Sequence, residues 1–268
     1  MLKLNNVEVK ITRFPDNTVK FDLENGMIKR FNEISWFFES MEELFTLIGL
    51  VDKLKDTQVD LYLPYMPNAR MDKIQNDNEG FMLKYFVETI DNLGFNKITI
   101  IDPHSDVYKE WVKHTEWIYD EDLVKRLITI SKNIIKMTEK TDHVTLVYPD
   151  AGARSRYTSI IGANENLYGV KERDHATGNI ISFDLVGNVP SNPILIVDDI
   201  CSKGGTFHFT AKKLREKGFT GPIYLYITHA EETIEQGELL KPESEIKRIF
   251  TTNSIMRKDI AKTTMFIL

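Results

Sequence analysis

The chain has 268 residues, 42% of them hydrophobic, and a formal net charge of −6 at pH 7. This length and apolar content can supply the cores of two domains, and the acidic balance argues against a nucleic-acid-binding protein, which usually presents a basic face. A single cysteine excludes an internal disulfide framework, and the N-terminal segment lacks the apolar core of a signal peptide. No apolar run approaches the length of a membrane span, so we expect a cytoplasmic protein.

Strand and helix patterns alternate through the first half of the chain. Alternating residues on both sides of a segment that contains Pro and Asn predict a hairpin or a loop, and the apolar patterns that follow predict a strand, a helix, a strand, a helix and a strand. These elements cover residues 7–13 and 19–22 for the hairpin, and then 34–38, 41–54, 59–63, 81–93 and 97–101. Such alternation is typical of a parallel α/β sheet.

A second series of the same kind follows a predicted helix at 123–137. Its predicted elements are strands at 144–148, 194–197, 223–227 and 247–251, a helix at 207–217, and strand-like runs at 167–170 and 180–183. A polar stretch at 138–142 separates the two series. We therefore predict two α/β domains with mainly parallel sheets, residues 1–138 and residues 139–268.

The run ILIVDDICSKGGT at residues 194–206 leads an apolar strand directly into a glycine turn that opens a helix. Gly204 and Gly205 permit close backbone approach, so amides at the helix N-terminus can point at a phosphate. Asp198 and Asp199 would repel a bare phosphate, but they can accept hydrogen bonds from sugar hydroxyls or face a divalent cation. The run predicts a site for a phosphorylated sugar, with a purely structural turn as the alternative.

Three further polar clusters follow predicted strands, at the sheet edge where parallel α/β folds bind ligands. Arg70 and Lys73 are suited to phosphate oxygens, with ordinary surface charge as the alternative. His104 lies between two acids and is suited to a metal or a phosphate, with a structural histidine as the alternative. Asp150 precedes a small-residue turn and two cations, which suits a metal-bound pyrophosphate or, alternatively, a helix cap.

A polar stretch at residues 169–178 joins two strand-like runs as a predicted hairpin. Lys171 and Arg173 are two residues apart, so they project to the same side of an extended chain. Both are suited to stabilising charge on a transferring phosphoryl group, and a solvated charged hairpin is the alternative.

Taken together, and in the same order along nearly the whole chain, these segments resemble the ribose-phosphate pyrophosphokinases, also called phosphoribosyl pyrophosphate synthetases. The matching segments are residues 14–16 (adenine loop), 64–73 (ATP segment), 102–104 (Asp-Leu-His magnesium motif), 149–152 (Pro-Asp-x-Gly element), 171–173 (Lys-x-Arg of the catalytic flexible loop) and 197–206 (acceptor loop). The resemblance implies two phosphoribosyltransferase-type, Rossmann-like domains, the first binding ATP and the second binding the acceptor.

The resemblance also implies a reaction and a set of site residues. The two terminal phosphates of ATP would pass to the anomeric hydroxyl of ribose 5-phosphate in the presence of Mg²⁺, with release of AMP. The implied catalytic residues are Lys171 and Arg173, and the implied metal ligands are His104 and Asp150. The implied ATP-binding residues are Phe14, Asp16, Arg70, Asp72, Lys73 and His104. The implied acceptor-binding residues are Asp198, Asp199, Ser202, Lys203, Gly204, Gly205 and Thr206.

The chain departs from the family pattern in the acceptor loop, where Ser202 replaces an acid and Lys203 replaces a threonine. The loss of a negative charge and the gain of a positive one would suit an acceptor with a 5-diphosphate, such as ADP-ribose in NAD salvage. Thr18 replaces a glutamate of the adenine loop and Met71 a glutamine, which leaves adenine selectivity open. Family members continue beyond the residues that match the C-terminus, so we expect a homodimer, with the family's hexamer as the alternative.

Two other classes stay open on the sequence alone. A phosphoribosyltransferase that consumes phosphoribosyl pyrophosphate would share the loop at 198–206 but would not require the adenine-loop, ATP and His104 segments. A non-catalytic regulatory paralogue would keep the fold and lose the catalytic cations. The retained Lys171, Arg173 and His104 favour an enzyme.

Overall fold

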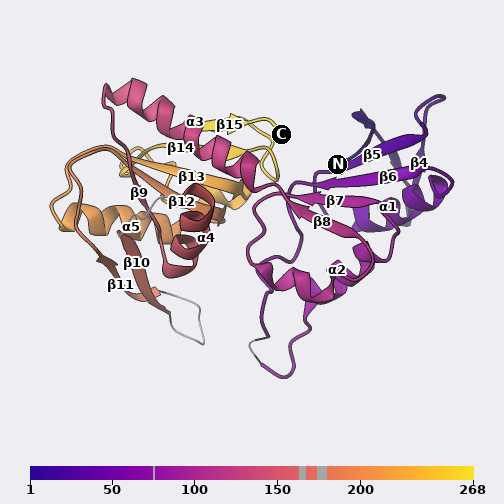
Figure 1. The fold of residues 1–268 in the computed structure, drawn as a ribbon, viewed down its shortest axis with the longest axis horizontal. Helices are drawn as coiled ribbons and strands as arrows, with labels where there is room; N and C mark the ends of the chain where they lie inside the picture. Colours follow the sequence, from indigo (N-terminus) through magenta and orange to yellow (C-terminus); the bar gives the residue numbers. More distant parts are fainter. Residues whose placement is uncertain (75, 163–166, 174–179) are drawn as a thin grey trace. The chain divides into compact units, whose positions relative to one another are not determined.

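The computed structural model describes residues 1–74, 76–162, 167–173 and 180–268, with the backbone alone for 171–173 and 180–182. The chain divides into two compact units, residues 1–120 and residues 121–268. Each unit is built on its own sheet, flanked by helices (Figure 1). The predicted α/β class with mainly parallel sheets is confirmed.

The first unit contains a six-stranded sheet in the order β2-β1-β5-β6-β7-β8. Strands β5 to β8 are parallel, whereas β1 and β2 are antiparallel to their neighbours. The sheet strands are β1 (Leu2–Leu4), β2 (Val7–Glu8), β5 (Phe31–Trp36), β6 (Gln58–Leu63), β7 (Lys97–Ile100) and β8 (Glu116–Tyr119). The helices are α1 (Glu42–Lys53), α2 (Met82–Asp91) and the 3-10 helix η1 (Asp106–Trp111). Strands β3 (Lys10–Arg13) and β4 (Val19–Asp22) form a separate hairpin, as the sequence predicts.

Apolar spacing explains how these elements pack. Helix α2 buries Leu83, Phe86, Val87 and Ile90, which recur every three or four residues and so share one face. Strand β6 buries alternate residues, as expected for a strand whose other face is partly covered. This packing fixes the carboxyl ends of β6 and β7, where two of the predicted site segments begin.

The buried carboxylate of Asp91, at the end of α2, holds the backbone that leads into β8. It accepts hydrogen bonds from the backbone amides of Lys113 (2.7 Å), His114 (2.8 Å) and Thr115 (3.1 Å), and from the indole Nε1 of Trp117 (3.1 Å). Burial acts to raise the pKa of Asp91, but these hydrogen bonds together hold it below its ordinary value.

Replacement of Asp91 by alanine is expected to lower the free energy of unfolding by roughly 2–4 kcal/mol, because the donors lose their acceptor. Since the folded-state pKa is lowered, this stabilisation is complete above the unfolded-state pKa and is lost as the pH falls through the folded-state pKa. Urea unfolding at neutral and acidic pH, with the exposed Asp52→Ala as control, checks both effects. Equal stability of wild type and Asp91→Ala at neutral pH would contradict this role of Asp91.

The second unit contains a five-stranded parallel sheet in the order β15-β14-β13-β12-β9. Its strands are β9 (Thr145–Val147), β12 (Ile194–Cys201), β13 (Ile223–Ala230), β14 (Ile246–Thr252) and β15 (Thr263–Phe266). Its helices are α3 (Glu121–Glu139), α4 (Ala151–Ile161), α5 (Gly205–Glu216) and the 3-10 helix η2 (Glu232–Gln236). Strands β10 (Tyr168–Arg173) and β11 (Ile180–Val186) pair as an antiparallel hairpin, as the sequence predicts.

Helices α3 and α5 cover opposite faces of this sheet (Figure 1). Successive residues of β13 point to opposite faces, and Tyr224 donates a hydrogen bond to Glu139 of α3, whereas Leu225 packs in the core that contains Leu214 of α5. All eight residues of β13 are buried, because it lies between β12 and β14 and beneath both helices.

The division between the units falls at residues 120 and 121, before α3, rather than at the expected 138 and 139. Helix α3 contacts α4 and β13. At its end, Glu139 also accepts a hydrogen bond from Lys247 of β14 at 2.7 Å. These contacts tie α3 to the second unit. In the described part of the chain, no helix is both long enough and apolar enough to cross a bilayer.

Candidate active site

The carboxyl ends of β9 and β12 lie side by side in the second unit, since the strands are parallel and Val147 pairs with Ile196. This register brings Asp150, which follows β9, close to Asp198 of β12. The strand ladder of β12 continues past the acidic pair to Cys201. The two aspartates therefore lie in the second half of an interior strand rather than in the loop after it.

Asp198 and Asp199 occupy different environments although they are adjacent. Asp199 is 3% exposed and its Oδ2 lies 3.2 Å from Nη1 of Arg156 on α4. Its backbone amide donates a hydrogen bond of 3.0 Å to Oδ1 of Asp198. Burial raises the pKa of Asp198, and the nearby negative charges of Asp199 and Asp150 act in the same direction. Such a pair favours hydroxyl donors or a cation as its ligand.

Asp150 is the N-cap of α4. One of its carboxylate oxygens accepts a hydrogen bond of 2.9 Å from the backbone amide of Ala153. The helix cap that the sequence left open as an alternative is thus present. No group of three or more His, Cys, Asp and Glu side chains with the arrangement of a metal site occurs among the described residues. Metal ligation by Asp150 and His104 stays a prediction.

Gly204 has a backbone conformation and surroundings that require glycine. Its φ is +78°, and a Cβ atom at this position would lie 2.2 Å from Cδ1 of the buried Leu239. Its carbonyl accepts the amides of Phe207 (3.1 Å) and His208 (3.0 Å) and so starts α5. The sharp turn therefore sets the direction in which the helix N-terminus points.

Gly205, the first residue of α5, differs from Gly204 in both respects. It is exposed, its φ lies outside the left-handed region, and a Cβ atom built on it would contact nothing within 4 Å. Packing does not require glycine here. The open space leaves the first amides of α5 accessible to a ligand, because these amides have no partner within the helix.

The other acceptor-loop residues have different degrees of exposure. Lys203 is exposed and Thr206 is half-buried. Ser202 is half-buried, and its Oγ lies 2.8 Å from Oγ1 of Thr233, a residue that the sequence reasoning did not single out. The structure thus places all seven predicted acceptor residues, 198–199 and 202–206, near the carboxyl end of β12 and the start of α5.

In the first unit, Asp102 and His104 follow β7. Asp102 is fully buried, accepts a hydrogen bond of 3.3 Å from the hydroxyl of Tyr119, and has a φ of +43°. A left-handed conformation is uncommon outside glycine and occurs often at functional turns. His104 lies two residues further on and is half-buried.

The predicted ATP segment follows β6 in the same unit. Met66 and Ala69 are buried and anchor it, whereas Arg70 and Lys73 are exposed and Asp72 is half-buried. The first part of the segment is therefore held in the core, whereas Arg70 and Lys73 in the second part lie at the surface. Met71, where the family has glutamine, packs against the apolar core of this unit.

The predicted adenine loop is the turn between β3 and β4. Phe14 is 46% exposed at this turn. Oδ1 of Asp16 accepts hydrogen bonds from the backbone amide (3.0 Å) and the hydroxyl (2.7 Å) of Thr18, and these bonds lower the pKa of Asp16. Thr18, where the family has glutamate, therefore orders the turn through Asp16.

Lys171 and Arg173 lie in β10, where their backbones pair with Phe183 and Ile180 of β11. Their side chains lie outside the described part of the structure, so their catalytic assignment stays a prediction.

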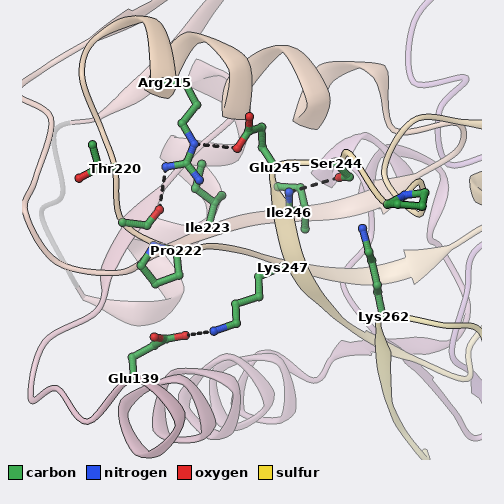
Figure 2. A pocket seen from close by; sticks show the side chains of 12 residues that line it. Glu139, Arg215, Thr220, Pro222, Ile223, Ser244, Glu245, Ile246, Lys247 and Lys262 are labelled. Carbon is green, nitrogen blue, oxygen red and sulfur yellow. Dashed lines mark hydrogen bonds and ion pairs between the residues drawn. The ribbon is translucent and has the colours of Figure 1, made fainter.

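A cavity of about 620 Å³ lies elsewhere in the second unit, at the amino ends of β13 and β14 (Figure 2). Four of its five charged side chains form two ion pairs. Arg215 Nε lies 2.7 Å from Glu245 Oε2, and Lys247 Nζ lies 2.7 Å from Glu139 Oε1. None of the predicted site residues lines this cavity, and it is distinct from the carboxyl edge that carries the acceptor loop.

No profile of a known protein family matches the chain, but comparison with known proteins found relatives and similar structures. The ribose-phosphate pyrophosphokinase of Sulfurisphaera tokodaii is 26% identical over 235 residues, which cover 83% of this chain and 74% of the relative. That of Bradyrhizobium diazoefficiens is 24% identical over 266 residues, 96% of this chain and 81% of the relative. The crystal structure of phosphoribosylpyrophosphate synthetase from Mycobacterium smegmatis matches with a TM-score of 0.75 at 18% identity, covering 97% of this chain and 86% of that one.

The chain is a two-unit α/β protein, and its fold matches that of phosphoribosylpyrophosphate synthetase. More particularly, the homologues of the chain are ribose-phosphate pyrophosphokinases, and the resemblance identified from the motifs is confirmed. Several relatives are longer than the aligned region, and the chain spans 60% of the relative from Marinomonas sp..

Proposed function

We propose that the protein is a Mg²⁺-dependent pyrophosphokinase that transfers the β,γ-diphosphate of ATP to the anomeric hydroxyl of ribose 5-phosphate. The hydroxyl oxygen forms a bond to the β-phosphorus, the bond from that phosphorus to the bridging oxygen of AMP breaks, AMP leaves with the electron pair, and the hydroxyl proton is released. The observation that carries the proposal is the joining of Asp198 and Asp199 to the Gly204-Gly205 turn on one rigid strand end.

The second unit would hold the acceptor. Its ribose hydroxyls would donate to the carboxylates of Asp198 and Asp199, which suits a pair whose charges repel each other. The 5-phosphate would accept from the amides of Gly205 and Thr206 at the start of α5. The fixed turn at Gly204 pre-organises these donors, so little ordering accompanies binding.

The first unit would hold ATP through Phe14 and Asp16 at the adenine loop and through Arg70, Asp72 and Lys73 at the ATP segment. Carboxylate oxygens suit Mg²⁺, and we propose Asp150 of the second unit as one ligand, with His104 of the first unit as a separate candidate ligand for a metal-bound phosphate. When bound, the ion would neutralise charge on the triphosphate. Lys171 and Arg173 would stabilise the transferring diphosphoryl group, since catalysis of this kind is mainly positioning and charge stabilisation.

ADP-ribose is the second candidate acceptor, with the same chemistry. The observation that favours it is the exposed ammonium-bearing Lys203 on the turn, where the family has a neutral threonine. A second phosphate attached to the 5-phosphate would extend toward solvent, and a lysine there would attract it. Because exposed charge pairs contribute only about 0–1 kcal/mol, a direct product assay is more informative than affinity alone.

The deciding experiment incubates the protein with magnesium-ATP and either ribose 5-phosphate or ADP-ribose, and separates the nucleotides and sugars. AMP formation with a diphosphate on ribose 5-phosphate supports the proposal. A diphosphate on ADP-ribose alone replaces the acceptor and keeps the chemistry. Absence of turnover with both acceptors contradicts the proposal and favours a regulatory paralogue or a phosphoribosyltransferase.

Replacement of Lys171 by alanine is expected to reduce AMP formation at least 1000-fold, as for other cations that stabilise a phosphoryl-transfer transition state. The far-ultraviolet circular dichroism spectrum should not change. Lys125→Ala, an exposed lysine on α3, is the matched control and should keep the wild-type rate. A wild-type rate in Lys171→Ala would remove this side chain from the mechanism.

A further inference from the structure

The acceptor loop is supported by the segment that follows β13, residues 231–239, which we call the supporting segment. The backbone amide of Glu231 donates to the carbonyl of Cys201 at 2.8 Å and so extends the sheet to the start of the loop. Next, Oγ1 of Thr233 lies 2.8 Å from Oγ of Ser202 and donates a hydrogen bond of 3.2 Å to Oε2 of Glu231. A chain of hydrogen bonds thus joins Ser202 to Glu231 through Thr233.

The direction of these hydrogen bonds follows from the number of protons available. A threonine hydroxyl has one hydrogen, and that of Thr233 is given to the carboxylate of Glu231, which can only accept. The contact between the two hydroxyls therefore has Ser202 as the donor and Thr233 as the acceptor. With its one hydrogen used in this way, Ser202 has none to give to an acceptor phosphate. Its role in this arrangement is to hold the loop.

The supporting segment also packs against the next two residues of the loop. A Cβ atom on Gly237 would lie 1.8 Å from the carbonyl oxygen of Lys203, which shows how closely the two backbones approach. The buried side chain of Leu239 occupies the space beside Gly204. Three successive loop residues, 202 to 204, thus contact one segment that lies about 30 residues further along the chain.

We propose that the supporting segment positions the acceptor loop for catalysis, with Thr233 and Glu231 as positioning residues that act through Ser202. The inference rests on the proposed function for the identity of the ligand. The amides of Gly205 and Thr206 can bind a phosphate only if the turn before them is fixed, and the side chain of Ser202 joins this turn to the supporting segment. Loss of the hydrogen-bond chain releases the turn and weakens acceptor binding, while the ATP segment in the first unit is unaffected.

The test compares Thr233→Val, which keeps the shape and removes the hydroxyl, with Thr233→Ser, which keeps the hydroxyl. Thr233→Val is expected to raise the KM for the acceptor about 5- to 10-fold, as for the loss of one hydrogen bond, and to leave the KM for ATP unchanged. Thr233→Ser should stay within about twofold of wild type by the same reasoning. Thr129→Val, an exposed threonine on α3, is the matched control.

Amide hydrogen exchange of the ligand-free protein provides a second readout that needs no activity. Peptides that cover residues 200–206 should exchange faster in Thr233→Val than in wild type, Thr233→Ser or Thr129→Val. If wild type uses neither acceptor, the proposed function fails, and the exchange rates alone decide whether the supporting segment fixes the loop. Unchanged exchange, an unchanged acceptor KM in an active enzyme, or an equal rise in the KM for ATP would each overturn the inference.

Discussion

Replacement of Asp198 by asparagine is expected to lower turnover with the acceptor about 10- to 100-fold, while the folded protein becomes more stable at neutral pH. The loss of turnover reflects hydrogen bonds from ribose hydroxyls to a charged carboxylate, which contribute roughly 1.5–3 kcal/mol each. The gain in stability follows because asparagine has nearly the same shape and removes a charge that burial, Asp199 and Asp150 all disfavour. Binding and stability thus place opposite demands on this residue.

The raised pKa of Asp198 also determines how the free energy of unfolding changes with pH. An acid whose folded-state pKa lies above its unfolded-state pKa binds a proton more tightly when folded, so its ionisation destabilises the fold as the pH rises between the two values. Urea unfolding across this range should show wild type losing stability relative to Asp198→Asn as the pH rises. Asp142→Asn, an exposed carboxylate in the same unit, is the control. An Asp198→Asn protein that is less stable than wild type at neutral pH would contradict the prediction.

Substitution of the two adjacent glycines by alanine should separate structure from binding. Gly204→Ala is expected to lower the free energy of unfolding by about 2–5 kcal/mol, because alanine at φ +78° is strained and its Cβ would overlap Leu239. Gly205→Ala meets no neighbouring atom and should leave stability unchanged or slightly raised, since alanine favours helix. If a phosphate approaches the Gly205 amide, the added methyl group should nevertheless raise the KM for the acceptor.

Thermal unfolding and acceptor titration of the two variants together check this contrast. A stable Gly205→Ala enzyme with a wild-type acceptor KM would mean that the phosphate lies elsewhere. A Gly204→Ala protein as stable as wild type would mean that Leu239 can move away from the turn. The KM for ATP serves as the internal control in both variants, since the ATP segment belongs to the first unit.

Much of the acceptor site could be predicted from the sequence because its signals are local. An apolar, β-branched run followed by two glycines predicts a strand, a turn and a helix, and the structure shows β12 and α5 in these places. The pairing of β3 with β4 could likewise be predicted from the turn residues and the alternating pattern. Long elements with a clear period gave boundaries within a few residues, as for α1 and α2.

Other elements gave weaker local signals. Helix α4 is made largely of small and charged residues, and its buried face consists only of Ala153, Tyr157 and Ile160, so its apolar stripe is too narrow to stand out in the sequence. Strands β8 and β15 have four residues each, and they lack a turn motif like the one that marks the equally short strands β3 and β4. The partnership of Ser202 with Thr233 spans 31 positions and depends on how β12 and β13 pair, which no local pattern encodes.

The hydrogen bonds of Ser202 also bear on any attempt to exchange substrate preference with a relative. An aspartate at position 202, as in the family pattern, would place a second carboxylate beside the single hydroxyl of Thr233, which already serves Glu231. One hydrogen cannot satisfy two carboxylates, and the acids would repel each other. Residues 202, 231 and 233 therefore have to be exchanged together. A variant that receives only the relative's acceptor loop would place two carboxylates beside the one hydroxyl of Thr233.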